Sequence, residues 1–506
     1  MTAKTTLTGA SPACKASLSW QELPWQKIQQ QVLQLQLRIA KAEREGRKGK
    51  VKALQRLLTT SFAAKCMAVK RVTSSTGAKT PGVDGVTWST DLQKTKAITS
   101  LRRKGYKPLP TRRIYIPKKS GKLRPLSIPA LGCRGQQALH LLALEPIVEE
   151  RADPNAYGFR LKRSAQDAIE QCFNALGKTH SATFVLEGDI RDCFSQISHD
   201  WLLENIPMDK TILRKFLKAG FMEKGKLNPT ERGAAQGSVI SPALTILALS
   251  GLEGKIRPKT QYRRDGEKIN VVSYADDFIV TAASAELLKE KVMPKLVDAL
   301  KTVGLELSLE KTKITAIEDG FDFLGFNIRK YKNGRVFTKP SKASINGFRK
   351  EIRDLIKRGI ALPTESLIYA LNEKITGWCN YYRCVVSSKV FALIDNEIFQ
   401  ALKRWTFKRH ARKGKKWIIK KYYMRHNGNN WSFYCPIKGK NGKSKTLFLK
   451  KASDFKIRRH MKIIANANPF NPVYKEYFAK REEDRKKRRL LSFNTELTGL
   501  KIIQPY

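Results

Sequence analysis

An acidic turn between two apolar runs is the feature that most constrains the fold of this 506-residue chain. Residues 271–280 read Val-Val-Ser-Tyr-Ala-Asp-Asp-Phe-Ile-Val. Apolar runs on both sides of a short turn are typical of a β-hairpin with one face in a core, and here the tip carries Asp276 and Asp277. Adjacent carboxylates repel each other, so keeping both ionised needs a nearby cation, and oxygen ligands favour Mg²⁺. A solvated turn is the alternative, because Asp is a common turn residue.

A third carboxylate follows another apolar run. Residues 181–186 precede Glu-Gly-Asp-Ile-Arg-Asp-Cys-Phe at 187–194, so we expect Asp189 at the end of a neighbouring strand. Three carboxylates at the ends of adjacent strands can hold two divalent ions. Such a pair of ions activates the attacking oxygen and stabilises the leaving one in phosphoryl transfer.

These motifs resemble those of the reverse transcriptases encoded by bacterial group II introns, which are also the maturases of those introns. In that family an Asp before a Cys-Phe pair and a Tyr-Ala-Asp-Asp hairpin form the polymerase metal site. The resemblance implies that Asp189, Asp276 and Asp277 are catalytic and bind two Mg²⁺ ions, together with the backbone carbonyl of Ile190. It also implies an α+β right-hand polymerase with fingers, a palm with an antiparallel sheet and a helical thumb, also called domain X, plus a basic C-terminal DNA-binding segment.

Residues 112–126 predict the hairpin of the fingers, with a strand, a Gly turn, a second strand and cations around the turn. Such a basic tip can fold over a triphosphate, although an ordinary solvated hairpin would have the same pattern. The family match at Lys-x-Gly-Lys-x-Arg-Pro-Leu implies that Lys118 and Arg124 contact the incoming nucleotide.

Two further stretches resemble family motifs near the template and the nucleotide. In Tyr-Gly-Phe-Arg at 157–160, Gly permits close backbone approach, and Arg160 and the following Arg163 are expected to contact nucleic acid. Phe194 lies five residues after Asp189, where the family places a ring beneath the sugar of the incoming nucleotide. A ring there clashes with a 2′-hydroxyl and so selects deoxynucleotides, whereas a core Phe is the alternative.

Residues 233–238 read Gly-Ala-Ala-Gln-Gly-Ser, where the family usually has Gly-Thr-Pro-Gln-Gly-Gly in the loop that braces the new base pair. Gln236 is retained and is expected to contact the nucleotide. Ser238 would be strained if the backbone needs a positive φ there, which raises the question of polymerase efficiency. Lys311, in a further motif at 304–313, is expected near the active site and its nucleic acid.

The charge balance points to nucleic acid. The chain has 97 Lys and Arg against 44 Asp and Glu, a formal net charge of +53. This surplus exceeds what solubility requires and is typical of a protein that neutralises many phosphates. A membrane surface is the competing partner, but no apolar run approaches the ~20 residues of a spanning helix, and residues 1–24 lack the apolar core of a signal peptide. We expect a bacterial cytoplasmic protein, associated with the nucleoid when on DNA, and no membrane partner.

Residues 403–421 carry ten Lys or Arg and no acidic residue, interleaved with Trp405, Phe407 and Trp417. Cations among aromatic rings suit a surface that follows a phosphate backbone, with a solvated charge run as the alternative. In the family this segment belongs to a DNA-binding domain. The residues expected to contact nucleic acid are Arg404, Lys408, Arg409, Arg412, Lys416 and Trp417.

The sequence predicts a division of the chain into six parts. They are a disordered N-terminus at 1–24, an N-terminal extension of the reverse transcriptase at 25–100, fingers and palm at 101–338, thumb or domain X at 339–402, a DNA-binding domain at 403–465, and a connector remnant at 466–506. In many relatives this connector leads into an HNH endonuclease. No Cys or His follows His460, so we expect no such domain.

The resemblance implies an RNA-directed DNA polymerase and maturase. It would bind its group II intron RNA, promote its splicing and support retrohoming into target DNA by target-primed reverse transcription from deoxynucleoside triphosphates. One alternative is an RNA-binding splicing maturase with weak or absent polymerase activity, for which the changes at 234–238 are the sequence argument. A domesticated reverse transcriptase used in defence or repair is another.

Overall fold

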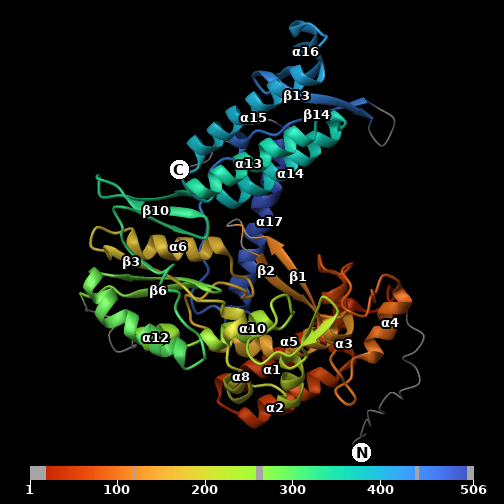
Figure 1. Cartoon of the computed structure of the whole chain (residues 1–506), viewed down its shortest axis with the longest axis vertical. Helices are drawn as coiled ribbons and strands as arrows, with labels where there is room; N and C mark the ends of the chain where they lie inside the picture. The colour runs from red at the N-terminus through yellow and green to blue at the C-terminus, as the bar shows by residue number, and fades with distance from the viewer. Residues whose placement is uncertain (1–18, 118–120, 122, 258–265, 439–443, 499–506) are drawn as a thin grey trace, which may run out of the picture.

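The computed structural model describes residues 19–117, 121, 123–257, 266–438 and 444–498, with side chains as far as residue 487. Figure 1 shows a broad lower body of mixed helices and strands and a narrower upper part made largely of helices. Within the described ranges, no helix is both long enough and apolar enough to cross a membrane.

The N-terminal helices form a bundle around α5, at the bottom of Figure 1. Their apolar residues recur at helical spacing, and Ile28, Val32 and Ile39 of the first helix are buried as that spacing predicts. The expected disorder of 1–24 is wrong for its last residues, because Leu23 is buried and Trp20 packs edge-on against Trp25; residues 1–18 lie outside the described part. The helices are α1 (Trp25–Arg44), α2 (Lys48–Thr60), α3 (Phe62–Thr73), α4 (Asp91–Ser100) and α5 (Leu131–Arg151).

The palm is an antiparallel sheet in the order β6-β7-β3-β8, buried on both faces. Successive residues of a strand point to opposite faces, so Leu186 joins the core shared with the N-terminal helices while Val185 joins the core that contains α6. The strands are β3 (Phe184–Asp189), β6 (Asn270–Tyr274), β7 (Asp277–Ala282) and β8 (Lys313–Ala316). The helices around them are α6 (Ala165–Leu176), α7 (Cys193–Gln196), α8 (His199–Asn205), α9 (Lys210–Leu217), α10 (Ser241–Leu249), α11 (Leu252–Ile256), the π-helix Leu287–Val292 and α12 (Met293–Lys301).

The fingers hairpin is present as predicted, but it does not stand alone. It forms a four-stranded sheet in the order β2-β1-β4-β5, with a second hairpin that the sequence analysis did not anticipate. Tyr115 donates a hydrogen bond to Glu223 at 2.6 Å, and Arg113 lies 3.9 Å from the ring centroid of Phe221, so the two hairpins brace each other. The strands are β1 (Thr111–Pro117), β2 (Leu123–Ile128), β4 (Phe221–Glu223) and β5 (Lys226–Asn228).

The thumb is helical, as the family resemblance implies, and a small sheet precedes it. Trp378 stacks on Phe348 with 4.7 Å between ring centroids, and the Tyr382 ring centroid lies 4.9 Å from that of Phe326, so these rings pack together in the core. The predicted boundary between residues 402 and 403 is wrong, because α15 runs without a break across it. The elements are β9 (Phe321–Phe323), β10 (Phe326–Lys330), β11 (Val336–Pro340), α13 (Lys342–Arg358), α14 (Thr364–Tyr382) and α15 (Ser388–Arg409).

Beyond the thumb, a short helix leads into a three-stranded antiparallel sheet in the order β12-β13-β14. No sheet was predicted for this part of the chain. The elements are α16 (Lys415–Tyr422), β12 (Tyr423–His426), β13 (Asn429–Lys438), β14 (Ser444–Phe448) and the 3₁₀-helix η4 (Ala452–Asp454).

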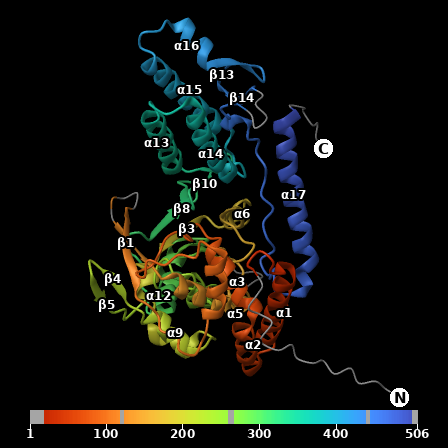
Figure 2. The ribbon, with the colours of Figure 1, turned by 90° about the vertical axis from the view of Figure 1, so that its right-hand side faces the viewer.

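Residues 456–482, which we call the C-terminal strap, first descend from the upper part to the lower body and then enter α17, which runs back upward in Figure 2. The strap is held at Asp167 of α6, whose 1% exposed carboxylate accepts hydrogen bonds from His460 Nε2 at 2.8 Å, the Ile463 N–H at 2.7 Å and Arg481 at 3.1 Å. The expected connector remnant is therefore an integral part of the fold. The elements at this end of the chain are the 3₁₀-helix η5 (Pro472–Tyr474) and α17 (Lys475–Thr498).

Candidate active site

The structure brings the three predicted carboxylates together at one end of the palm sheet. Asp189, the last residue of β3, lies directly opposite Asp277, the first residue of β7, in the antiparallel register. Asp276 occupies the preceding turn, next to Ala275, which has a left-handed φ of 60°. The hairpin and the neighbouring strand thus have the arrangement that the sequence predicted.

The carboxylates perturb one another electrostatically. The pKa of Asp277 is raised to about 6, first because the surrounding protein desolvates it and then because Asp276 and Asp189 repel its charge. Lys311 and Arg124 oppose this rise in pKa. The site therefore holds more negative charge than its own cations neutralise.

Lys311 is placed beside Asp189, as expected from its motif. Its Nζ lies 2.5 Å from Asp189 Oδ2, and this hydrogen bond raises the pKa of Lys311. The backbone fixes the contact, because the Ser308 N–H donates to the Asp189 carbonyl at 2.8 Å. Ile190 and Leu307 form an antiparallel β-bridge. The residues on either side of them make its hydrogen bonds, so the bridge does not use the Ile190 carbonyl.

The donor chemistry of the site fits a hard divalent cation, because all three side chains offer carboxylate oxygens. Among the residues that the structure describes, no group of three or more His, Cys, Asp or Glu side chains is arranged to hold a metal ion as it stands. The Lys311 ammonium bonds Asp189 instead. A cation that binds through Asp189 Oδ2 would have to displace this ammonium.

Residues 155–158 pack against the turn that carries Asp276 and support it. Ala156 forms a parallel bridge with Ser273, and the Tyr157 N–H donates to the Ser273 carbonyl at 2.9 Å. A Cβ on Gly158 would lie 2.1 Å from the Ala275 nitrogen, so only glycine fits. The close approach expected of this glycine is thus made to the catalytic turn.

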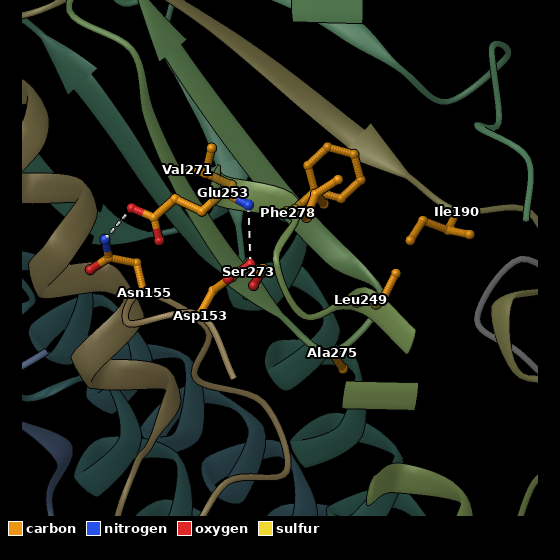
Figure 3. A pocket seen from close by; sticks show the side chains of 10 residues that line it. Asp153, Asn155, Ile190, Leu249, Glu253, Val271, Ser273, Ala275 and Phe278 are labelled. Atoms are coloured by element: carbon orange, nitrogen blue, oxygen red, sulfur yellow. Dashed lines mark hydrogen bonds between the residues drawn. The ribbon is translucent and has the colours of Figure 1, made fainter. Parts of the chain in front are cut away.

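A pocket under the hairpin contains the polar groups that hold this brace (Figure 3). Asn155 donates to Glu253 at 3.0 Å, and Asp153 accepts hydrogen bonds from the Gly251 and Glu253 N–H groups at 2.9 and 3.0 Å. Asp153 thereby stabilises the N-terminus of α11.

Arg160 and Arg163 do not face nucleic acid in this structure, contrary to the sequence-based prediction. The guanidinium of Arg160 is 2% exposed, pairs with Glu149 at 2.9 Å and donates to two backbone carbonyls. Arg163 donates to the carbonyl of Ala465 in the C-terminal strap at 2.6 Å, and burial lowers its pKa to about 10. Both cations hold the protein together.

The expected nucleotide contacts of the fingers are placed in part. Arg124 is exposed in β2 and is close enough to lower the pKa of Asp277, so its charge reaches the carboxylates. Lys118 lies outside the described residues.

The Gln236 loop joins the fingers to the palm. The Gln236 carbonyl accepts from the Ser127 N–H at 2.7 Å. The left-handed position is Gly237, with φ of 105°, where a Cβ would lie 2.7 Å from the Ser127 carbonyl oxygen. Ser238 does not have a positive φ and its hydroxyl accepts from Ser241 at 3.0 Å, so the strain considered for this serine does not arise.

Phe194 lies in α7, half-buried, with its ring edge-on to that of Phe159 at 6.0 Å between centroids. The Phe194 carbonyl accepts from the Ala234 N–H at 2.6 Å, so the Gln236 loop also supports this helix. Sequence analysis assigns no role to Phe159. Its place within the Tyr-Gly-Phe-Arg motif is the signal that could have drawn attention to it.

The basic segment is exposed for the most part. Trp417 is 42% exposed and is flanked by Lys421 at 4.7 Å and Lys413 at 5.6 Å from its ring centroid. Arg409 instead donates to the carbonyls of Ile360 and Leu362, which makes it a thumb contact and corrects its expected role. The other predicted contacts in this segment are exposed, namely Arg404, Lys408, Arg412 and Lys416.

Trp431 of β13 is a further exposed ring that the sequence analysis missed. It is 46% exposed and lies 5.8 Å from Tyr423 between ring centroids. Trp405, by contrast, is buried, and its indole donates to the Gly359 carbonyl at 3.1 Å.

Three family models match the chain in order. They are the N-terminal domain of reverse transcriptase at residues 20–101, the reverse transcriptase (RNA-dependent DNA polymerase) at 116–328, and the group II intron, maturase-specific domain at 345–423. The last match continues past residue 402, in agreement with the uninterrupted α15.

Known proteins with similar sequences include two from bacteria. Protein YkfC of Escherichia coli (strain K12) is 36% identical over 321 residues, which cover 54% of this chain and 83% of that protein. Group II intron-encoded protein LtrA of Lactococcus lactis subsp. cremoris is 27% identical over 412 residues, 62% of this chain and 68% of that protein. A solved telomerase from Candida albicans aligns with a TM-score of 0.37 at 12% identity over 62% of this chain and 64% of that one, a likeness too low to support an argument. The chain belongs to the group II intron-encoded proteins that combine a reverse transcriptase domain with a maturase-specific domain.

Proposed function

We propose that this protein copies RNA into DNA by adding deoxynucleotides to a primer 3′-hydroxyl, and that it is the maturase of its own group II intron RNA. The observation that carries the polymerase proposal is the register pair of Asp189 and Asp277, with Asp276 in the adjoining turn. Three carboxylates at one edge of a palm sheet, in a chain of this family, support nucleotidyl transfer over RNA binding alone.

The residues of the site divide the work of the reaction. Asp189, Asp276 and Asp277, with the Ile190 carbonyl, would hold two Mg²⁺ ions, which supply Lewis-acid activation of the primer hydroxyl and stabilisation of the leaving oxygen. Release of Asp189 frees the Lys311 ammonium to neutralise phosphate charge at the same edge.

The remaining contacts position the nucleotide. Arg124 and Lys118 of the fingers bind the triphosphate, where Arg can form two parallel hydrogen bonds and Lys supplies a point charge. Phe194 lies beneath the deoxyribose and excludes a 2′-hydroxyl, and Gln236 supports the new base pair from the loop that joins fingers to palm.

The thumb and the basic segment suit the maturase role. The maturase-specific match covers residues 345–423, which include α13 to α16, and exposed cations continue to its end. We propose that this surface binds the intron RNA during splicing and then the target DNA during retrohoming by target-primed reverse transcription. Both partners are present in the cytoplasm of a bacterium, where the protein would act on the nucleoid.

Primer extension on an RNA template tests the polymerase proposal. Extension with deoxynucleotides and Mg²⁺ by the wild type should vanish in Asp276→Ala, while binding of intron RNA stays unchanged because the turn contributes no cation. Intron splicing should also persist in Asp276→Ala. Equal extension by the wild type and the variant would refute the assigned site, and no extension by either, with splicing intact, would leave a maturase without polymerase activity.

The maturase without efficient polymerase activity remains a second candidate, because Ala234 and Ala235 replace Thr-Pro. Restoring Thr-Pro and changing Ser238 to Gly should raise extension sharply if these changes have weakened the enzyme. We expect little gain, since Ser238 has no positive φ and Gly237 supplies the left-handed residue.

A further inference from the structure

Phe159 has a backbone conformation that bulky residues rarely adopt. Its φ is 58°, in the left-handed region, and its side chain is 52% exposed. A bulky residue at positive φ is strained, and this strain is not offset by burial of the ring. The position therefore calls for a reason other than core packing.

Both neighbours of Phe159 are fixed by the palm. Gly158 packs directly against Ala275 of the catalytic turn, and Arg160 is buried in its ion pair with Glu149. The backbone of Phe159 is thus held on both sides by contacts with the palm.

That ring meets the sugar-selecting residue. The rings of Phe159 and Phe194 lie 6.0 Å apart between centroids at an interplanar angle of 76°, an edge-to-face contact. The backbone of Phe194 is anchored separately, through the hydrogen bond from the Ala234 N–H to its carbonyl. Phe194 is therefore fixed at its backbone by one element and at its ring by another.

We propose that Phe159 is a positioning residue that determines sugar specificity by holding the Phe194 ring in place. A ring excludes a 2′-hydroxyl only while it cannot rotate away, and the edge of Phe159 blocks that rotation. The inference rests on the proposed role of Phe194. Loss of Phe159 should leave deoxynucleotide addition nearly unchanged and admit ribonucleotides more readily.

The test is single-nucleotide incorporation on a primed RNA template, with kcat and KM measured separately for a deoxynucleotide and the matching ribonucleotide. Phe159→Gly removes the ring and also the strain of the positive φ, because glycine adopts this conformation readily. We therefore expect the variant to fold with the same backbone conformation. We expect its preference for deoxynucleotides to fall by about two- to tenfold, mostly through the ribonucleotide KM. Phe159→Tyr keeps the edge-to-face contact and should therefore keep the wild-type preference for deoxynucleotides.

The double variant separates a positioning role from a direct contact. If Phe159 acts through Phe194, then Phe159→Gly should change nothing further in a Phe194→Ala background. Phe173→Ala is the matched control, since Phe173 is a 38% exposed Phe on α6 and should leave the preference unaltered.

Each outcome identifies which step fails. If Phe194→Ala lowers the preference and Phe159→Gly does not, the inference about Phe159 is overturned while the sugar-selecting role of Phe194 stands. If neither variant changes the preference, both assignments are wrong. Additive effects in the double variant would also overturn the inference, because they would mean that Phe159 contacts the nucleotide itself.

Discussion

Lys311 Nζ lies 2.5 Å from Asp189 Oδ2, so an ammonium group of the chain itself neutralises one of the three palm carboxylates. The lysine side chain is 66% exposed and the Asp189 side chain 22% exposed, which makes this a weak surface pair that an ion can displace. The contact neutralises part of the negative charge at this edge of the sheet.

Removing that ammonium should tighten metal binding. In Lys311→Met, Mg²⁺ no longer competes with Nζ for Asp189, so its dissociation constant should fall by up to about fivefold, the range of an exposed ion pair. Calorimetry with Mg²⁺ and no nucleotide measures this directly. Lys313→Met is the control, because it removes a lysine charge from β8 but keeps the Lys311 ammonium on Asp189. It should change the Mg²⁺ affinity less. Equal effects of the two variants would mean that only net charge matters.

Gly158→Ala should inactivate the polymerase without affecting RNA binding. The added Cβ would lie 2.1 Å from the Ala275 nitrogen and must displace the turn that carries Asp276. A small displacement of a catalytic group costs about 10²-fold in rate, so we expect single-turnover extension to fall on that order. Gly132→Ala in α5 is the control, because a Cβ there meets no atom within 4 Å. Wild-type rates in Gly158→Ala would show that the turn relaxes freely.

Asp167 should be a main determinant of stability, because it holds the C-terminal strap to α6. Burial raises its pKa, but the hydrogen bonds from His460, Ser164 and the Ile463 N–H outweigh this and bring the pKa from 3.8 to about 2. Because the pKa of Asp167 is lower in the folded than in the unfolded protein, its ionised carboxylate stabilises the fold at pH values above the unfolded pKa. This contribution is complete above about pH 4 and is lost as the pH falls towards 2. Asp167→Asn should cost about 3 kcal/mol of unfolding free energy at neutral pH, because it removes a buried charge that pairs with the Arg481 guanidinium.

Denaturant unfolding and limited proteolysis of the strap measure that loss. Glu482→Gln is the matched control, since it removes the exposed pair between Lys162 and Glu482 on the same strap. We expect only a small change in unfolding free energy, because water screens this exposed pair. Similar losses for the two variants would contradict the role of the buried carboxylate.

The sequence predicted the features that depend on local pattern. The apolar runs on both sides of the Asp276 turn predicted its strands, and the family resemblance implied the helical thumb. Long-range pairing was out of reach, because His460 reaches Asp167 across 293 residues and the strands β4 and β5 are only three residues each. The sequence of a basic chain also does not show which group a given arginine pairs with. Arg160 was therefore expected to contact nucleic acid, although it is buried in an ion pair with Glu149.

Two adjacent cations of the basic segment also differ in whether they bond to the protein itself. Lys408 is exposed at the end of α15, whereas Arg409 donates to the carbonyls of Ile360 and Leu362. Lys408→Ala should weaken binding to duplex DNA and reduce the slope of log affinity against log salt by about 0.9, the contribution of one phosphate contact. Arg409→Ala should leave that slope unchanged and lower the melting temperature, because it removes the hydrogen bonds that join α15 to the loop after α13. A salt slope reduced by Arg409→Ala and unaffected by Lys408→Ala would reverse the assignment, and would mean that Arg409 leaves the thumb carbonyls when nucleic acid binds.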